Sequence, residues 1–172
     1  MDSMIDKLCL KRLCLPSNTN IDQLHNGQIK LNLCNCDSFK HIAIVFKCGN
    51  NLNPLSYGFN TYDDSRSTGM VHAEINAINN LITQDANKKR LVKIDILVIR
   101  TSNTGKIGMS KPCIKCIINL SQLPQKKGYI LKNIFYSDTN GLIIKTTLRS
   151  LIETKNYHIT RYYLNHNFKF NL

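Results

Sequence analysis

This sequence has no long apolar run and no regular cysteine pattern, and it has few acidic residues. No stretch approaches the roughly 18 consecutive apolar residues that a membrane span requires. Residues 1–16 also lack the apolar segment and the small-residue cleavage site of a secretory signal. The seven cysteines are odd in number and irregularly spaced, which argues against a disulfide framework and favours reduced thiols or metal ligands. We therefore expect a soluble, cytoplasmic protein with no membrane partner.

The shortage of acidic residues leaves the chain strongly basic. It has 11 Asp and Glu residues against 23 Lys and Arg residues, which gives a net charge of +12. Such a field attracts phosphates, so a nucleotide or a nucleic acid is a plausible partner. However, the lysines are scattered, and an excess of Lys, Asn and Ile is also what the codon bias of an AT-rich genome produces. The charge alone leaves both interpretations open.

The distribution of apolar residues predicts an α/β domain over residues 39–172, preceded by an N-terminal extension over residues 1–38 in which residues 5–15 could form a helix. Short apolar runs predict buried strands at 42–46, 94–99 and 133–137, with further strands at 55–60, 142–145 and 158–164. Helical spacing predicts helices at 70–84, at 112–124 and at 147–153. The Asn140-Gly141 pair predicts a hairpin. This order predicts helices that cover a mixed sheet.

Two short motifs at predicted helix starts carry residues that bind metals: His72-x-Glu74 and Pro112-Cys113-x-x-Cys116. Cys113 and Cys116 are three residues apart on a helix, so their thiols share one face. His72, at the start of the other helix, can supply a third ligand. Three protein ligands leave a fourth position for water, which is the arrangement of a catalytic zinc ion.

Glu74 lies two residues after His72, where its carboxylate can stand beside the metal's water without binding the metal. Zinc lowers the pKa of that water, and Glu74 can carry the proton to a ring nitrogen and to a departing amine. The combined motifs predict a zinc-dependent hydrolytic deaminase of a nucleobase, with Zn²⁺ as the cofactor.

Other interpretations of these residues remain open. A purely structural zinc site would need a fourth protein ligand, for which Cys48, Cys34 and Cys36 are the candidates. The domain could also bind zinc without catalysis, as a binding or regulatory module. No role is predicted for the other histidines, His25, His41, His158 and His166.

The motifs and the element order over residues 42–137 resemble the cytidine deaminase-like superfamily. The resemblance implies a three-layer α/β/α fold, with a mixed five-stranded sheet and helices on both faces. With a histidine at position 72, the first motif resembles the branch of the superfamily that contains deoxycytidylate, tRNA adenosine and polynucleotide cytidine deaminases. The Asn140-Gly141 hairpin instead implies an antiparallel last strand pair, as in enzymes that act on free nucleosides. Members of this superfamily often form pairs, so the resemblance leaves open that this chain forms a homo-oligomer.

The resemblance also implies substrate contacts. In Tyr57-Gly58-Phe59-Asn60, Asn60 would contact the substrate sugar, although a turn-forming Asn explains it equally well. The backbone N–H of Ala73 would face the base, and the backbone around Ser110 would meet the departing amino group. Lys111 stands where many relatives have Glu or Ser.

The substrate that these features favour is cytosine in a nucleoside or nucleotide. The alternative is cytosine or adenine within RNA or single-stranded DNA, which needs aromatic stacking platforms. The sequence has no tryptophan, but other aromatic residues could stack on bases: Tyr57, Phe59, Tyr62, Tyr162, Tyr163, Phe168 and Phe170.

Overall fold

The computed structural model describes residues 40–49, 54–62, 70–85, 90–102, 106–155 and 157–159. All of them belong to one unit, Ser38–Leu172. The predicted N-terminal extension, with its helix, and residues 160–164 of the predicted last strand lie outside the described residues. Within the described ranges, no helix is long and apolar enough to cross a membrane.

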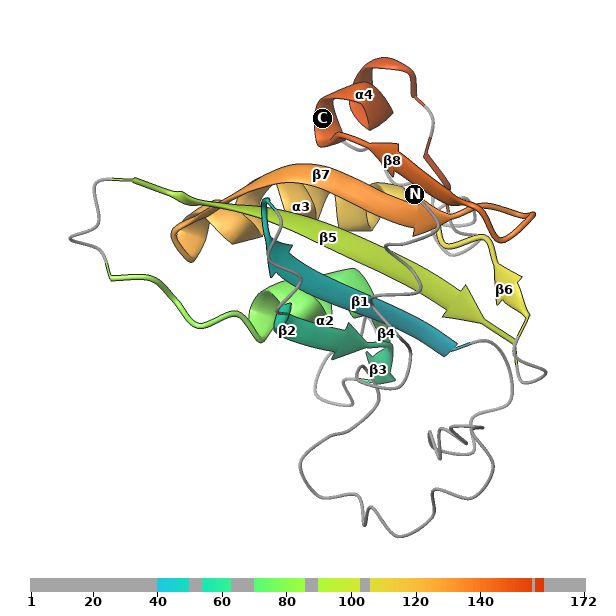
Figure 1. The fold of residues 1–172 in the computed structure, drawn as a ribbon, viewed down its shortest axis with the longest axis horizontal. Helices are drawn as coiled ribbons and strands as arrows, with labels where there is room; N and C mark the ends of the chain where they lie inside the picture. The colour runs from blue at the N-terminus through green and yellow to red at the C-terminus, as the bar shows by residue number, and fades with distance from the viewer. Residues whose placement is uncertain are drawn as a thin grey trace, which may run out of the picture. The chain divides into compact units, whose positions relative to one another are not determined.

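A mixed sheet forms the centre of the unit (Figure 1). Its strands are β1 (Lys40–Lys47), β2 (Pro54–Phe59), β5 (Val92–Thr101), β7 (Tyr129–Ser137) and β8 (Ile143–Thr146), in the order β2-β1-β5-β7-β8. The β5–β7 pair is parallel and the other pairs on this path are antiparallel. A sixth short strand, β6 (Ile107–Gly108), pairs with the end of β5. The predicted mixed sheet is therefore confirmed.

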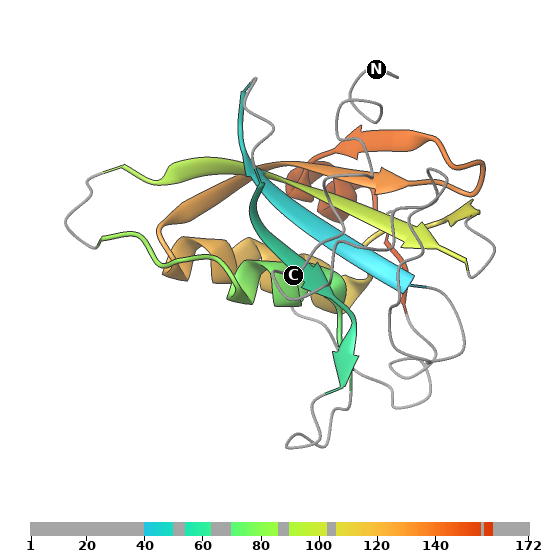
Figure 2. The ribbon, with the colours of Figure 1, turned by 60° about the horizontal axis from the view of Figure 1, so that its bottom comes forward.

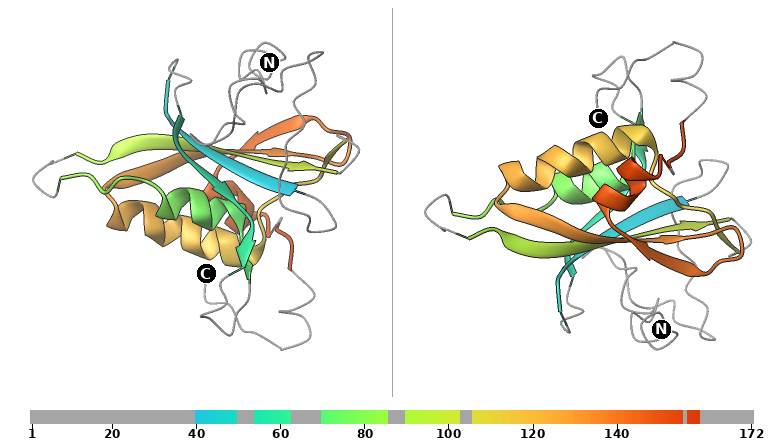
Figure 3. Two further views of the ribbon diagram at one scale, coloured as in Figure 1. Left: turned by 90° about the horizontal axis from the view of Figure 1, so that it is seen from below. Right: turned by 90° about the horizontal axis from the view of Figure 1, so that it is seen from above.

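Within the described ranges, three helices cover one face of this sheet (Figure 3). They are α2 (Ala73–Asn79), α3 (Ile114–Lys126) and α4 (Leu148–Glu153). A separate two-stranded ladder, β3 (Thr61–Tyr62) and β4 (Met70–Val71), precedes α2. The described residues thus form two layers, and the helices that the resemblance implies on the opposite face are not among them.

The core lies between the sheet and the helices. Every second residue of the central strands faces it, as the alternation of a pleated strand requires. The buried set includes Ala43, Val45, Ile94, Ile96, Val98 and Ile134 from the strands, and Ile78, Ile117, Leu120 and Leu151 from the helices. Burying one such Ile or Leu stabilises the fold by about 1.5–3 kcal/mol, so this core holds the strand ends in register.

Helix α2 is shorter than the predicted helix at 70–84. Met70 and Val71 pair with β3 instead, and the helix ends at Asn79. The Lys127 ammonium donates to the carbonyls of Asn79 and Leu81, at 2.8 and 2.7 Å, and so satisfies the last turn from outside. Ile82, which fits the helical spacing, is 79% exposed. The helix therefore ends before the helical spacing of apolar residues does, at the point where Lys127 contacts it.

Two further boundaries differ from the predictions. Pro124 lies inside the last turn of α3, and the helix ends at Lys126. The predicted loop at 101–111 contains strand β6. The hairpin is as predicted: Asp138 Oδ1 accepts from the N–H groups of Asn140 and Leu142, both at 2.8 Å, and Gly141 has a φ of 80°. The last strand pair is therefore antiparallel.

Candidate metal centre and pocket

Helix α2 lies beside the edge strand β2, and side chains fix it there (Figure 2). The hydrogen bonds run from Ser56 Oγ to Ala77 O (2.7 Å), from Asn76 Nδ2 to Phe59 O (2.9 Å) and from Asn80 Nδ2 to Tyr57 O (2.8 Å). A Cβ atom on Gly58 would overlap the backbone of Ala73 and Ala77. Glycine at this position therefore lets the helix approach β2 closely, which sets the position of its first turn.

The segment before α3 is anchored by two buried serines. Ser110 Oγ donates to Val98 O at 2.7 Å and accepts from the N–H of Ser137 at 2.8 Å. Ser137 Oγ donates to Gly108 O at 2.6 Å, and the N–H of Ser110 donates to Ser137 O at 2.8 Å. The Ser110 side chain and N–H thus tie the segment to β5 and β7, three residues before Cys113.

These two anchors bring His72, Cys113 and Cys116 together. His72 Nδ1 lies 3.2 Å from Cys116 Sγ and 3.4 Å from Cys113 Sγ, and the two sulfur atoms are 3.6 Å apart. Tetrahedral zinc with ordinary bond lengths would separate nitrogen from sulfur by about 3.6 Å and sulfur from sulfur by about 3.8 Å. The triangle fits such an ion within a few tenths of an ångström, so this group can hold a metal ion.

No fourth protein ligand joins the group among the described residues. The Cys48 thiol instead donates to Asp95 Oδ1 at 3.1 Å. Cys34 and Cys36 lie outside the described residues. Among the described residues, the group therefore offers three candidate ligands to a metal ion.

His72 and Cys113 are also the N-cap residues of α2 and α3, and neither side chain caps its own helix. Other residues do so: the N–H of Ala73 donates to Asn60 Oδ1, and the N–H of Ile114 donates to the carbonyl of His158, both at 2.9 Å. Helix α4, by contrast, has an ordinary cap in Thr147. The two N-cap side chains are thereby left to face each other as ligands.

Protons are shared unequally within the triangle. The pKa of Cys113 is lowered by hydrogen bonds with Cys116 and His72, while the pKa of Cys116 is raised by its hydrogen bond with Cys113 and by burial. The hydrogen bond with Cys113 raises the pKa of His72. One thiolate therefore sits beside a thiol and an imidazole, and a metal ion that binds all three displaces the protons.

Glu74 is 4% exposed, and burial raises the pKa of its carboxyl group. It lines a pocket of about 310 Å³ together with Asn60, His72 and Cys113. The structure thus places the predicted catalytic acid beside the triangle. Of the predicted substrate contacts, Asn60 lines the pocket, and the N–H of Ala73 is engaged by Asn60 Oδ1. The backbone around Ser110 stays a prediction, and the N–H of Ser110 itself donates to Ser137 O.

Among the described residues, six more line the pocket without having been assigned a site role from sequence: His41, Met70, Arg100, Met109, Lys111 and His158. His158 lies at the pocket because its backbone forms an isolated β-bridge with Cys113, which is 45 positions away in the chain. No local sequence pattern predicts a bridge between such distant residues. His41 and Arg100 could have been found, because each continues the core-facing alternation of its strand by two residues. Burial, and then the charge of Arg100, lower the pKa of His41 to about 4, so this imidazole is neutral at pH 7.

Comparison of the chain with protein-family models, with curated proteins and with solved structures returned no significant match. Support for a function therefore comes from the motifs and from the geometry of this pocket.

Proposed function

We propose that this protein is a zinc-dependent hydrolytic deaminase that acts on cytosine in a nucleoside or nucleotide and releases ammonia. The observation that carries the proposal is the His72, Cys113 and Cys116 triangle beside the buried Glu74. His72, Cys113 and Glu74 line one pocket. Glu74 follows a metal-ligand position by two residues, and both thiols come from one helix start. This combination is the one by which zinc deaminases are recognised.

Each residue has a role in this proposal. A zinc ion held by His72, Cys113 and Cys116 would supply a nucleophile at neutral pH by lowering the pKa of water. Glu74 would take one proton from the attacking water and give it to the ring nitrogen. It would then take a second proton from the hydroxyl group newly bonded to the base carbon and give it to the amine, which leaves as ammonia. Burial raises the pKa of Glu74, which helps the side chain to hold a proton between these steps.

The surroundings of Glu74 orient the substrate in this proposal. Since Asn60 Oδ1 holds the N–H of Ala73, the Asn60 amide nitrogen is the group of this pair that can donate to a sugar hydroxyl. The backbone carbonyl of Ser110 would accept from the departing amine. Resemblance to the cytidine deaminase-like superfamily, with its three-layer fold, is part of the proposal, and the antiparallel β7–β8 pair agrees with its free-nucleoside branch.

The test begins with bound zinc, measured on freshly purified protein. Ammonia release is then followed with cytidine, deoxycytidine, their 5′-monophosphates, adenosine, tRNA and a single-stranded oligonucleotide. Glu74→Gln keeps the size of the side chain and removes the base, and Glu153→Gln, an exposed site on α4, serves as the matched control.

We expect turnover of a small cytosine compound by the native protein and the Glu153→Gln variant. Glu74→Gln should retain zinc and lose turnover by about 10²-fold or more. Zinc at one per chain with no turnover of any substrate would instead establish a catalytically silent zinc module. Protein without zinc would exclude the proposed chemistry.

A further inference from the structure

Two cysteines separated by two residues at the start of a helix can do more than bind a metal ion. The same spacing occurs in enzymes that exchange thiols with disulfides. In this protein Cys113 is the N-cap residue of α3 and Cys116 lies in its first turn. The distance between the two thiols, and their access from the pocket, decide whether the pair can also be oxidised.

The two sulfur atoms lie close enough to bond after a small movement of the side chains. They are 3.6 Å apart, and a disulfide bond of about 2.05 Å brings them about 1.5 Å closer. Residues three apart in an α-helix have Cα atoms about 5 Å apart, which is within the range that a disulfide spans. The N–H of Ile117 donates to the carbonyl of Cys113 at 3.0 Å. The backbone of this turn is therefore already in place for the bond.

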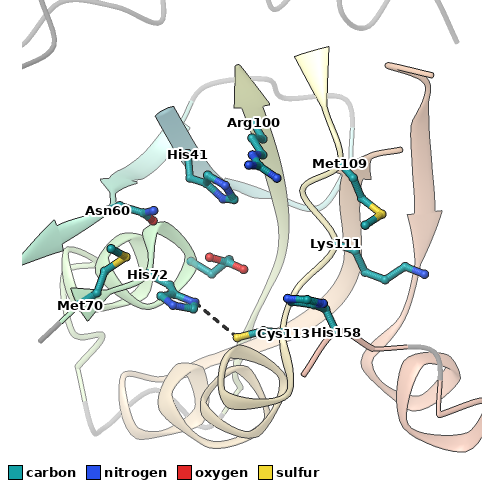
Figure 4. Close-up of a pocket in the computed structure, with 10 residues that line it drawn as sticks. His41, Asn60, Met70, His72, Arg100, Met109, Lys111, Cys113 and His158 are labelled. Carbon is teal, nitrogen blue, oxygen red and sulfur yellow. Dashed lines mark hydrogen bonds between the residues drawn. The ribbon is translucent and has the colours of Figure 1, made fainter. Parts of the chain in front are cut away.

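The two thiols differ in their access to small molecules. Among the described residues, Cys113 lines the pocket of about 310 Å³, whereas Cys116 does not line it and is 0% exposed. Figure 4 shows the sulfur of Cys113 beside His72 and near His158. A small molecule in the pocket can therefore approach the sulfur of Cys113, and Cys116 is placed to react with that sulfur from within the protein.

No other thiol of the described residues is within reach of Cys113. The remaining described cysteine is Cys48, whose backbone N–H donates to the carbonyl of Lys93 at the start of β5. The pocket lies near the end of the same strand, at Arg100. These two positions are seven residues apart, about 23 Å along an extended strand. Cys116 is therefore the thiol that the described structure offers to Cys113 as a partner.

We propose that Cys113 and Cys116 form a redox site that is oxidised by a low-molecular-weight disulfide, and that this oxidation releases the metal ion. The inference rests on the metal site of the proposed function, but it requires no turnover of a nucleobase. It adds a second reaction to the same pair of thiols and makes metal occupancy depend on the redox state around the protein.

The reaction is a double thiol–disulfide exchange. The thiolate of Cys113 attacks one sulfur of the small disulfide, whose S–S bond breaks and releases one small thiolate. The thiolate of Cys116 then attacks the sulfur of Cys113, and the second small thiolate leaves. The two cysteine sulfurs lose two electrons in total. The small disulfide gains these electrons and becomes two thiolates, which take up protons from water.

Oxidation removes two of the three candidate metal ligands. A thiolate is the form of cysteine that binds a metal, and the bond between Cys113 and Cys116 consumes both thiolates. His72 is then the remaining ligand of the group, which is too few to hold zinc tightly. Reduction of the disulfide restores the three ligands, so the release is reversible.

The test treats zinc-loaded protein with bis(2-hydroxyethyl) disulfide. A chromophoric chelator follows the release of zinc, and peptide mapping by mass spectrometry locates the disulfide. Trypsin cleaves after Lys115, so a bond between Cys113 and Cys116 appears as residues 107–115 linked to residues 116–126. The variants are Cys113→Ser and Cys116→Ser, with Cys48→Ser as the matched control. Circular dichroism checks that each variant folds, and the map of the native protein decides even where a variant does not.

We expect the native protein and Cys48→Ser to release about one zinc ion for each linked pair of peptides. Dithiothreitol with added zinc should reverse both changes. Cys116→Ser should accumulate a mixed disulfide on Cys113, because the second thiol is missing. Cys113→Ser should react at least about tenfold more slowly, since its remaining thiol, Cys116, is buried.

Zinc that stays bound while the two peptides stay unlinked would overturn the proposal. Linkage of either peptide to another cysteine of the native protein would also overturn it, as would equal reaction rates for Cys113→Ser and Cys116→Ser. Linked peptides and zinc release in a protein that turns over no substrate would support the redox site and overturn the deaminase function. Turnover of cytosine without linkage would overturn the redox site and leave the deaminase function standing.

Discussion

The Oδ1 atom of Asn60 accepts a hydrogen bond from the backbone N–H of Ala73 at 2.9 Å. Ala73 is the first residue of α2 and stands between His72 and Glu74, so this bond ties the end of β2 to the part of the helix that carries the proposed chemistry. An N-cap residue usually satisfies its own helix with its side chain. Because His72 turns toward the two thiols, Asn60 replaces it in this task.

Asn60→Ala should therefore weaken both the fold and the metal centre. The N–H of the buried Ala73 would lose its acceptor, which costs about 1–3 kcal/mol of unfolding free energy. Zinc affinity should fall because the first turn of α2 is no longer held. Urea unfolding and zinc titration measure the two effects. Asn60→Asp keeps the acceptor oxygen and is the matched control, and unchanged stability in Asn60→Ala would refute the capping role.

Gly58→Ala should displace helix α2. The added Cβ would overlap the backbone of Ala73 and Ala77, and backbone atoms cannot move aside as the end of a side chain can. Overpacking of this kind costs about 1–3 kcal/mol or more. Gly108→Ala is the control, because its Cβ would meet Arg100 Cδ at 3.7 Å, an ordinary contact. Thermal unfolding should separate the two variants clearly, and equal melting temperatures would contradict the packing described for α2.

Removal of either thiol of the triangle should abolish tight zinc binding. Cys113→Ser and Cys116→Ser each leave two protein ligands, whereas Cys48→Ser changes a thiol that bonds Asp95 and lies outside the group. The native protein and Cys48→Ser should therefore hold about one zinc ion per chain. A chelator should lower the melting temperature of these two proteins, because a ligand bound only to the folded state stabilises it. A Cys113→Ser variant that retains stoichiometric zinc would refute the assignment.

Stability should fall on acidification, in part through His41. Its pKa is about 4 in the folded protein and 6.5 as a free side chain, so the unfolded chain binds more protons between these values. The contribution of His41 is therefore fully present above pH 6.5 and is lost as the pH falls toward 4, by at most about 1.4 kcal/mol per pH unit. Burial is the main cause, and Arg100 and His72 act in the same direction.

His41→Gln should flatten this part of the stability profile. Urea unfolding of both proteins at pH 7, 5.5 and 4.5 measures the difference. If the two proteins lose the same stability between pH 7 and pH 4.5, His41 is not held neutral by its surroundings.

Features that depend on near neighbours in the chain could be predicted from the sequence. Cys113 and Cys116 face the same way because an α-helix repeats every 3.6 residues, and Asn140-Gly141 forms a hairpin because these residues tolerate its backbone angles. The core strands were identified because they are short and continuously apolar. The predicted end of α2, at residue 84, was wrong. The helix ends at Asn79, whose carbonyl accepts from the ammonium of Lys127, a residue from another part of the chain.

The rest of the pocket depended on the tertiary structure. His41 faces Arg100 because the antiparallel register of β1 and β5 pairs them, and His158 reaches Cys113 through a single bridge between distant segments. His158 does not stand out in the sequence as a site residue, whereas His41 is marked by its place in the core-facing alternation of β1. Local spacing determined which residues can bind a metal, because backbone geometry repeats along a helix. Long-range strand register decided which charges surround the site, because register is set by the packing of a whole face and not by neighbouring residues.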